Sequence, residues 1–561
     1  MDVGQRIQIK YKIQTRTNYG TGPVSRGARD LPIAPPGLVL WILLASKLAS
    51  LLRTAVQQLR RNSVDRNMKV AVAGCCHGQL DATYKQISEL EARNDYKIEL
   101  VLINGDFQAI RNHQDLQCMA VPDKYKQLGT FYKYYTGEEK APVLTIVIGG
   151  NHEASNYMWE LYHGGWLAPN IYYLGGSGCV KVNGLRIAGA SGIYKAQDYR
   201  SGHHERMPYD KSNLRSAYHV RFYDVMKLRQ LSSLDVFMSH DWPVDITKYG
   251  DVAGLLKSKP FFKSDIEKGE LGSPPMMDLL RSLRPSYWFS AHLHCKFEAL
   301  VNHEPETGEL SLPSLGQTSL VTAQAEQDLS GEKASAANPD EIQLDDLDDV
   351  PESYPPLAAK PPLSIESGPG SNPDEILIED DEGGAVPAPP TSSASAAQVN
   401  DLVGARSGTV EDNRPPAKST RFLALDKCLP RRQYLHVLDL NSATPGSGLA
   451  TSPPTLTYDR EWLAISRALH PFLSTERYQP TLPPIWDIAP LIQESQRWVD
   501  ENVGEREIRH VQEFTMTAPG PINTNPRPAR NLQPPPWYTN PQTEAFCAML
   551  GLENKVNPPP V

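Results

Sequence analysis

The sequence predicts an α/β fold in which β-sheets are covered by helices on both faces. Short apolar runs rich in Val, Ile and Leu have the composition of buried strands, and several end at a Gly, Ser or Ala followed by a polar residue. Polar or amphipathic stretches of helical character separate the runs, for example residues 84–93 and 274–282. Apolar strands on both sides of helices are typical of sheets buried on both faces. The predicted strands are residues 69–74, 98–106, 143–151, 185–191, 235–241 and 287–294.

Length and composition describe an ordinary soluble protein with more than one domain. The chain has 561 residues, of which 40% are hydrophobic and 22% are charged. Its seven cysteines are an odd, scattered set without a CxxC pair. This spacing argues against a disulfide framework or a structural zinc knuckle, and it favours a reducing compartment.

The net charge of −9 is distributed unevenly along the chain. Residues 326–418 carry 20 acidic and 5 basic side chains, whereas residues 1–67 carry 11 basic and 3 acidic ones. The remainder is close to neutral. Whole-chain charge therefore gives no support for nucleic-acid binding, which must be argued from local patches.

The first 67 residues differ in character from the remainder of the chain. Residues 34–52 form an apolar run interrupted by Lys47, which is marginal for a bilayer span of about 20 apolar residues. A signal anchor and an amphipathic or disordered extension are two interpretations. We favour a third, an upstream extension or an incorrect start, because Met68 directly precedes the first predicted strand. We expect no membrane association.

From Met68 onward, the chain divides by composition into a region 68–325, a linker 326–418, an ordered part 419–514 and a Pro-rich tail 515–561. The linker is too poor in apolar residues to offset the entropy cost of ordering, and we predict that it is disordered. Its similar segments 338–349 and 372–382 are interpreted as solvated acidic chain, or alternatively as SUMO-interacting strands that bind RNA-processing proteins. Two strands around a Leu-Pro turn are predicted at 419–440, a helix at 458–469, and a short ordered island at 540–552.

Polar signals follow several predicted strands. Each one alone is typical of a turn or a satisfied buried polar residue, but strand ends in α/β sheets gather ligands, so the set is expected to converge. In chain order the signals are Cys75-x-His77, Gly105-Asp106, Gly150-Asn151-His152-Glu153, His240-Asp241 and His292-x-His294.

This ordered set resembles the ligand order of the calcineurin-like metallophosphoesterases. Two cations about 3.5–4 Å apart can activate a water and neutralise charge on a phosphoryl transition state. The resemblance implies that Asp106 bridges the two cations. It assigns Cys75, His77 and His294 to one cation, and Asn151, His240 and His292 to the other. His152 is not a ligand in the family; as the catalytic residue it would protonate or polarise the leaving oxygen.

The superfamily usually has Asp where this chain has Cys75. A thiolate is also anionic but softer, so it disfavours Mg²⁺ and Ca²⁺ and favours Zn²⁺ or Fe²⁺. The other motif positions are intact, which indicates specialisation rather than decay. The neighbouring Cys76 is expected to be a small buried residue, because its side chain should point away from that of Cys75.

Longer sequence motifs indicate one branch of the superfamily. The sequences AGCCHG, GDFQAIRN, DLQCMAVPDKY, GGNHEASNYMWEL, SHDWP and YWFSAHLH, followed by FLALDKCLPRRQYL, resemble the RNA lariat debranching enzyme family. The resemblance implies a metallophosphoesterase sandwich of mixed β-sheets flanked by helices, with a small C-terminal α+β domain. It also implies hydrolysis of the 2′–5′ phosphodiester of excised intron lariats, with Fe²⁺ and Zn²⁺ as cofactors and Mn²⁺ as a substitute. A branched RNA substrate in turn implies that the protein is located in the nucleus.

The family's lariat-recognition region corresponds to residues 191–221, which hold six basic and three acidic side chains interleaved with tyrosines. Cations suit phosphates, and aromatic faces suit splayed bases. Without the resemblance, an ordinary surface loop is the simpler interpretation. The candidate RNA-binding residues are Tyr194, Lys195, Tyr199, Arg200, Tyr209, Arg215 and Tyr218.

Two rival functions share parts of this pattern. A general metallophosphoesterase acting on proteins or cyclic nucleotides would share the ligand set but not the aromatic and basic segment. A scaffold built on a degraded phosphoesterase fold would lack ligands, above all at Asp106, Asn151 or His152, and none of these is missing.

Overall fold

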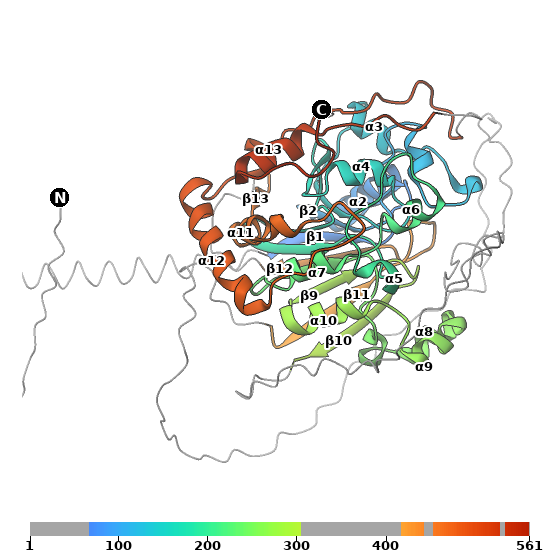
Figure 1. Cartoon of the computed structure of the whole chain (residues 1–561). Coiled ribbons are helices and arrows are strands. Elements are labelled where there is room, and N and C mark those ends of the chain that lie inside the picture. Colours follow the sequence, from blue (N-terminus) through green and yellow to red (C-terminus); the bar gives the residue numbers. More distant parts are fainter. Residues whose placement is uncertain (1–66, 304–416, 442–452, 528–532, 560–561) are drawn as a thin grey trace, which may run out of the picture. The chain divides into compact units, whose positions relative to one another are not determined.

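A computed structural model describes residues 67–303, 417–441, 453–527 and 533–559 (Figure 1). The predictions for the N-terminal extension and for the acidic linker with its SUMO-interacting segments fall almost wholly outside these ranges. The apolar run 34–52 also lies outside them. None of the helices in the described ranges has the length and apolar character needed to cross a bilayer.

Within the described residues, the first sheet has six strands in the order β12-β1-β2-β3-β5-β4. Strands β1, β2, β3 and β5 run parallel, whereas β12 and β4 at the two edges are antiparallel to their neighbours. The bounds are β12 Leu435–Asn441, β1 Asn67–Ala73, β2 Leu100–Asn104, β3 Leu144–Ile148, β5 Ile171–Tyr173 and β4 Gly165–Ala168.

The second sheet has seven strands in the described part of the chain, in the order β10-β11-β9-β8-β7-β6-β13. Its inner strands β11, β9, β8 and β7 run parallel, and the others are antiparallel. The bounds are β10 Phe297–Asn302, β11 Ser419–Ala424, β9 Tyr287–Ser290, β8 Val236–Ser239, β7 Leu185–Ala190, β6 Ser177–Val182 and β13 Leu456–Tyr458.

The two sheets pack face to face, and helices cover both outer faces. Along β1, Val70 and Val72 pack between the sheets with residues such as Met238, whereas Ala71 and Ala73 face the helices. This alternation is the period of two expected of a strand buried on both sides. The prediction of mixed β-sheets flanked by helices is confirmed.

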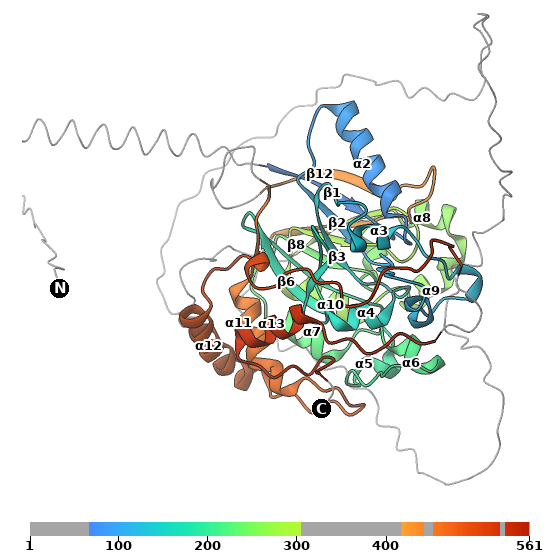
Figure 2. The same ribbon diagram turned by 90° about the horizontal axis from the view of Figure 1, so that it is seen from above.

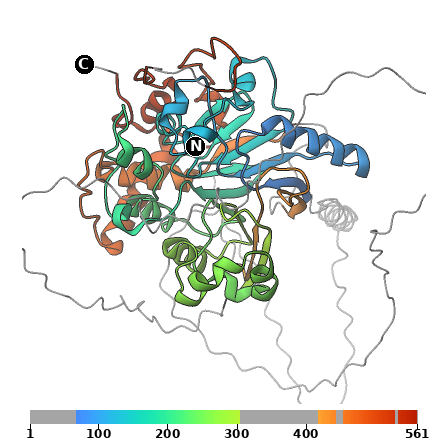
Figure 3. The same ribbon diagram turned by 90° about the vertical axis from the view of Figure 1, so that its right-hand side faces the viewer.

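Three helices pack on the outer face of the first sheet, and three supply most of the helical side chains buried on that of the second. Figure 2 shows α2 beside β1 and β12, with α11, α12 and α13 gathered at a different margin. In Figure 3 the green segment that carries α8 and α9 lies at the lower end of the described fold. The first three helices are α2 Leu80–Asn94, α3 Phe131–Thr136 and α4 Ser155–Glu160; the second three are α7 Phe222–Leu228, α10 Pro274–Leu283 and α11 Arg460–Leu469. The others described are α5 Ala196–Tyr199, α6 Lys211–Ser216, α8 Val252–Ser258, α9 Lys263–Lys268, α12 Ile485–Asn502 and α13 Pro541–Leu550.

Each predicted strand from residue 69 to residue 294 is present, as β1, β2, β3, β7, β8 and β9. Both strands predicted at 419–440 also form, but they do not pair with each other. Instead β11 enters the second sheet between β9 and β10, and β12 adds to the edge of the first sheet beside β1. The domain boundaries stay a prediction; the structure adds that the C-terminal segment shares both sheets with the region before it.

All seven cysteines lie in the described residues, where they are buried and form no disulfide. This agrees with the absence of a disulfide framework inferred from their spacing. The ordered island predicted at 540–552 contains α13, whose side chains Phe546, Cys547 and Leu550 join the core between the sheets.

Candidate metal centre

The polar signals of the sequence converge at one place, because each follows a parallel strand. Parallel strands have their carboxyl ends at the same edge of a sheet, and both sheets contribute here. Cys75 and His77 follow β1, Asp106 follows β2, Asn151 and His152 follow β3, His240 follows β8, and His292 and His294 follow β9.

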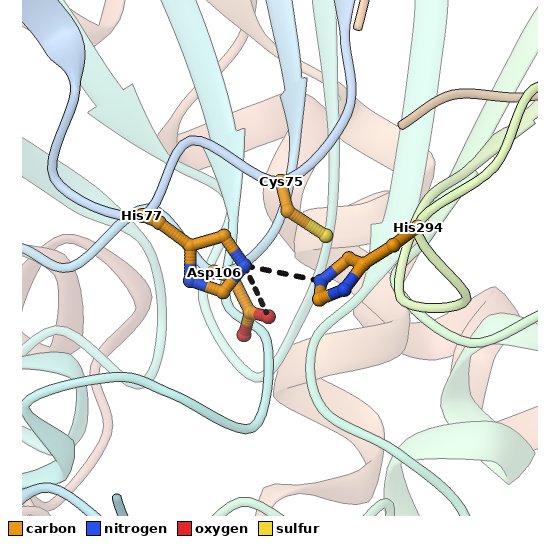
Figure 4. A group of neighbouring side chains, drawn as sticks. All are labelled: Cys75, His77, Asp106 and His294. Carbon is orange, nitrogen blue, oxygen red and sulfur yellow. Dashed lines mark hydrogen bonds and ion pairs between the residues drawn. The ribbon is translucent and has the colours of Figure 1, made fainter. Parts of the chain in front are cut away.

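The first group of donors is formed by Cys75, His77, Asp106 and His294 (Figure 4). One ligand atom from each lies within 4.8 Å of all the others. The Nε2 atoms of His77 and His294 are 3.1 Å apart, and the His77 Nε2 is 3.7 Å from Asp106 Oδ2. Four soft and hard donors therefore face one point in a buried setting.

The second group shares Asp106 with the first. The other carboxylate oxygen of Asp106, Oδ1, is 3.4 Å from His240 Nε2, which is 3.2 Å from Asn151 Oδ1. The rings of His240 and His292 lie side by side, with centroids 5.0 Å apart. One oxygen of Asp106 thus faces each group, which suits a carboxylate that bridges two cations.

Four of these residues have a left-handed backbone, which is unusual for side chains other than glycine. The φ angles are 46° for His77, 45° for Asp106, 61° for His292 and 48° for His294. Such conformations cost roughly 1–3 kcal/mol each and cluster at functional sites, where surrounding structure holds them in place. The strain at these four positions therefore marks the centre independently of side-chain chemistry.

Two glycines allow the loops to approach one another closely. A Cβ on Gly105, whose φ is 94°, would stand 2.3 Å from His240 Nδ1, and one on Gly150 would stand 2.1 Å from Asp106 Oδ1. Neither position can hold a larger residue without moving a donor. This explains why Gly precedes Asp106 and Asn151 in the sequence.

Burial keeps two of the candidate imidazole ligands neutral. It lowers the pKa of His77 to about 3 and that of His292 to about 3, so their lone pairs are available at physiological pH. Burial alone would raise the pKa of Asp106, but the surrounding histidines, led by His240, hold it well below its usual range. The carboxylate in turn raises the pKa of His240 against the effect of burial.

The residues present fit a pair of divalent cations. A typical bond from a zinc ion to an imidazole nitrogen is about 2.0–2.1 Å, so nitrogens 3.1 Å apart, as in His77 and His294, can bind one ion. The sulfur of Cys75 adds a soft donor to that group, and the amide of Asn151 adds a hard oxygen to the other. The ligand assignments themselves stay a prediction.

Residues behind the donors orient them, and sequence reasoning did not identify these. The Nδ1–H of His240 donates to the backbone carbonyl of Asn104 at 2.7 Å, which turns Nε2 toward the centre. The buried carboxylate of Glu153 accepts the backbone N–H groups of Phe107 at 2.7 Å and Gly150 at 3.1 Å, so it ties two site loops together. Glu153 directly follows His152 in the sequence, and this adjacency is the signal that could have indicated its role.

His152 lies at the accessible margin of the centre. Its backbone N–H donates to Asp106 Oδ1 at 2.9 Å, and its Nδ1 is 3.8 Å from Asp106 Oδ2. The His152 side chain is 13% exposed and that of the candidate ligand His77 is 21% exposed, whereas those of Asp106 and His240 are 1% and 0% exposed. It can therefore touch a molecule that arrives from solvent.

The predicted recognition region only partly gathers beside the centre. Tyr209 and Tyr218 line a cavity of about 70 Å³, whose lining also includes Gly149 and Gly150 of the loop after β3. Trp159 and other aromatic side chains also line it. Aromatic walls of this kind suit a flat ring such as an unstacked nucleobase.

The other candidates of this region lie outside the cavity. Tyr194 and Tyr199 pack ring against ring at 5.3 Å, and the backbone N–H of Tyr194 donates to the Asp241 carboxylate at 3.3 Å. Arg200 and Arg215 are exposed, and Lys195 is half-buried. The RNA-binding role of all seven residues stays a prediction.

Two mixed sheets with polar donors at the ends of five parallel strands define a metallophosphoesterase. In agreement, the family described as calcineurin-like phosphoesterase matches residues 68–296. The described region after the linker narrows this class, because the family described as the C-terminal domain of lariat debranching enzyme matches residues 417–555.

Whole-chain relatives give the same result. The chain is 40% identical over 503 residues to the lariat debranching enzyme of Schizosaccharomyces pombe. The alignment covers 88% of this chain and 98% of that enzyme. The chain is 39% identical to the enzyme of Arabidopsis thaliana, covering 88% of each chain, and 37% identical to that of Homo sapiens, covering 86% and 69%. The chain belongs to the lariat debranching enzyme family, and it is a phosphodiesterase of the metallophosphoesterase superfamily.

Proposed function

We propose that this chain hydrolyses the 2′–5′ phosphodiester at the branch point of excised intron lariats, which linearises introns for turnover. Relatives that align over most of the chain are named lariat debranching enzymes. The observation that carries the chemistry is the Asp106 carboxylate, with one oxygen facing each of two donor groups. Such a pair of sites suits an in-line displacement at phosphorus.

The side chains of the centre form two ligand sets. Cys75, His77 and His294 would hold one cation and Asn151, His240 and His292 the other, with Asp106 between them. Bound cations at these positions would supply an activated water and neutralise charge on the phosphoryl group.

His152 has a separate task, for which its position at the accessible margin suits it. Its imidazole delivers a proton to the departing 2′ oxygen of the branch nucleotide. The backbone N–H of His152 donates to Asp106, so the proton donor is fixed relative to the carboxylate that both donor groups share.

The metals we propose are Fe²⁺ and Zn²⁺, with Mn²⁺ as a substitute. The support is the thiol of Cys75, since sulfur ligands favour these softer ions over Mg²⁺. The thiol also lies close to a backbone donor, the N–H of His292, at 3.3 Å, which stabilises a thiolate.

For the RNA, we propose that the cavity beside Gly150 takes a base at the branch and that Lys195 faces the phosphates. The backbone N–H of the neighbouring Tyr194 donates to Asp241, which directly follows the candidate ligand His240, and this contact supports the proximity of Lys195 to the centre. The substrate supports a nuclear location. The acidic and aliphatic pattern at 338–349 and 372–382 supports contacts with RNA-processing proteins, SUMO among them.

The test compares a branched RNA that holds one 2′–5′ linkage with a linear 3′–5′ RNA. The full chain, loaded with Fe²⁺, Zn²⁺ or Mn²⁺ singly and in pairs under reducing conditions, is expected to cleave only the branch. His152→Ala is expected to lower kcat by about 10²–10⁴-fold with RNA affinity retained, because general acid catalysis contributes that much.

His510→Ala, at an exposed position, is the matched control and should keep full activity. Equal cleavage of the linear RNA would favour a general phosphoesterase. Full activity of His152→Ala would show that His152 is not the proton donor.

A further inference from the structure

The loop between β11 and β12, residues 425–434, passes over the edge of the sheets where the metal ligands lie. Strand β11 runs parallel to β9, with Ala424 opposite Ser290. The two chains therefore leave the sheet at the same edge. His292 and His294 stand two and four residues beyond the end of β9, and Lys427 stands three residues beyond the end of β11.

Backbone hydrogen bonds fix this loop to the strand end that carries the thiol. The N–H of Cys428 donates to the carbonyl of Cys75 at 2.9 Å, and the N–H of Gly74 donates to the carbonyl of Tyr434 at 2.9 Å. Lys427 is thus adjacent, in the chain, to a residue bonded directly to a candidate ligand. Its position relative to the first donor group is set by backbone contacts on both sides of Cys75.

The side chain of Lys427 is buried, with 7% of the residue exposed. Across the described ranges, no carboxylate lies within 4.0 Å of its ammonium group. The neighbouring Asp426 accepts the backbone N–H of Lys427 at 2.7 Å and lies 3.5 Å from Arg432.

A buried ammonium group is unfavourable unless it is paired with an anion. In the first donor group, the anions are the Asp106 carboxylate and the thiolate form of Cys75, and both would bind the candidate cations. An ammonium beside such a centre is therefore stabilised when an additional anion arrives. A phosphate oxygen of RNA is the anion that the proposed function brings to this place.

We propose that Lys427 binds a non-bridging phosphate oxygen of the branched RNA, so that the C-terminal segment supplies part of the substrate site. This inference rests on the proposed function. The oxygen belongs either to the 2′–5′ diester that is cut or to the adjoining 3′–5′ diester of the branch nucleotide. In both cases Lys427 acts as a point charge that orders the phosphate against the donors.

The primary test measures RNA affinity rather than activity. Lys427→Met keeps the length and apolar stem of the side chain, and Lys427→Arg keeps the charge. The probe is a fluorescent branched RNA with a non-hydrolysable 2′–5′ linkage, titrated into the metal-free full chain and again with Mn²⁺ present. Lys427→Met is expected to raise the Kd about tenfold, the usual scale for a lost charge-assisted hydrogen bond, while Lys427→Arg recovers most of the affinity.

The salt dependence of binding separates a phosphate contact from a packing effect. The slope of log affinity against log salt should fall by about 0.7–1 in Lys427→Met, since one phosphate contact is lost. Lys97→Ala is the control, because Lys97 is 83% exposed and paired with Glu91 before β2, at the opposite end of the parallel strands. Its affinity and slope should match those of the wild-type chain.

Cleavage of a linear dinucleotide with a 2′–5′ bond identifies the phosphate. If Lys427→Met raises KM for both the branched RNA and the dinucleotide, Lys427 contacts the diester that is cut. If it raises KM for the branched RNA alone, Lys427 contacts the adjoining diester. Unchanged RNA affinity with reduced metal content would overturn the proposal and assign Lys427 to the Cys75 thiolate. Wild-type protein that binds branched and linear RNA equally would instead refute the proposed function.

Discussion

Asp106→Asn is expected to abolish nearly all hydrolysis of the branch, with kcat reduced about 10²–10⁴-fold. Cations held at the centre would stabilise the phosphoryl transition state by several kcal/mol, and each 1.36 kcal/mol corresponds to about a factor of ten in rate. Asp106 is the carboxylate that the two donor groups share, and its oxygens lie 3.7 Å from His77 Nε2 and 3.4 Å from His240 Nε2. An amide of the same shape cannot balance two cations.

Metal analysis after dialysis, together with kcat on branched RNA, measures this effect. The variant should retain fewer than two cations per chain while keeping the thermal unfolding transition of the folded protein. Asp123→Asn serves as the control, because the Asp123 side chain is 95% exposed. Two tightly held cations and near wild-type turnover in Asp106→Asn would show that the carboxylate does not bridge.

Cys75→Ala is expected to lose activity by at least about 10²-fold, whereas Cys76→Ala keeps most of it. Loss of residues that merely support metal ligands costs about 10–100-fold, and a direct ligand should cost at least as much. Cys75 faces the donor group, but Cys76 packs in the core under α2 and α3, where burial raises the pKa of its thiol and keeps it neutral.

Parallel kinetics and thermal unfolding of the two variants decide between these roles. Cys76→Ala should lower stability by about 1 kcal/mol, because it removes a buried sulfur. Cys75→Asp should shift the metal preference toward Mn²⁺ and Mg²⁺, since a carboxylate is a harder ligand. An equal loss of activity in Cys75→Ala and Cys76→Ala would overturn the ligand assignment.

Much of the centre was predictable from the sequence, because its signals are local. Each donor follows a short apolar run, and parallel strands place such residues at one edge without any knowledge of the pairing order. The superfamily resemblance then supplied the roles. The left-handed backbone of His77 and Asp106 was not predictable, since local propensity disfavours it for residues other than glycine and only tertiary contacts maintain it.

The parts that the sequence did not reveal depend on contacts between distant residues. Lys69 of β1 pairs with Asp439 of β12, and Phe422 of β11 lies opposite Trp288 of β9. No periodicity encodes a pairing across the linker, so the strands at 419–440 were predicted but their partners were not. The position of Lys427 at the centre follows from those pairings.

X-ray absorption spectroscopy of the full chain loaded with Fe²⁺ and Zn²⁺ tests the central claim most directly. A two-cation centre built on Cys75 and Asp106 predicts two cations per chain and a metal–metal distance of about 3.5–4 Å. It also predicts a sulfur neighbour at about 2.3 Å from one metal, absent in Cys75→Ala. A single cation per chain, or two cations with neither a sulfur neighbour nor a metal–metal signal, would contradict it.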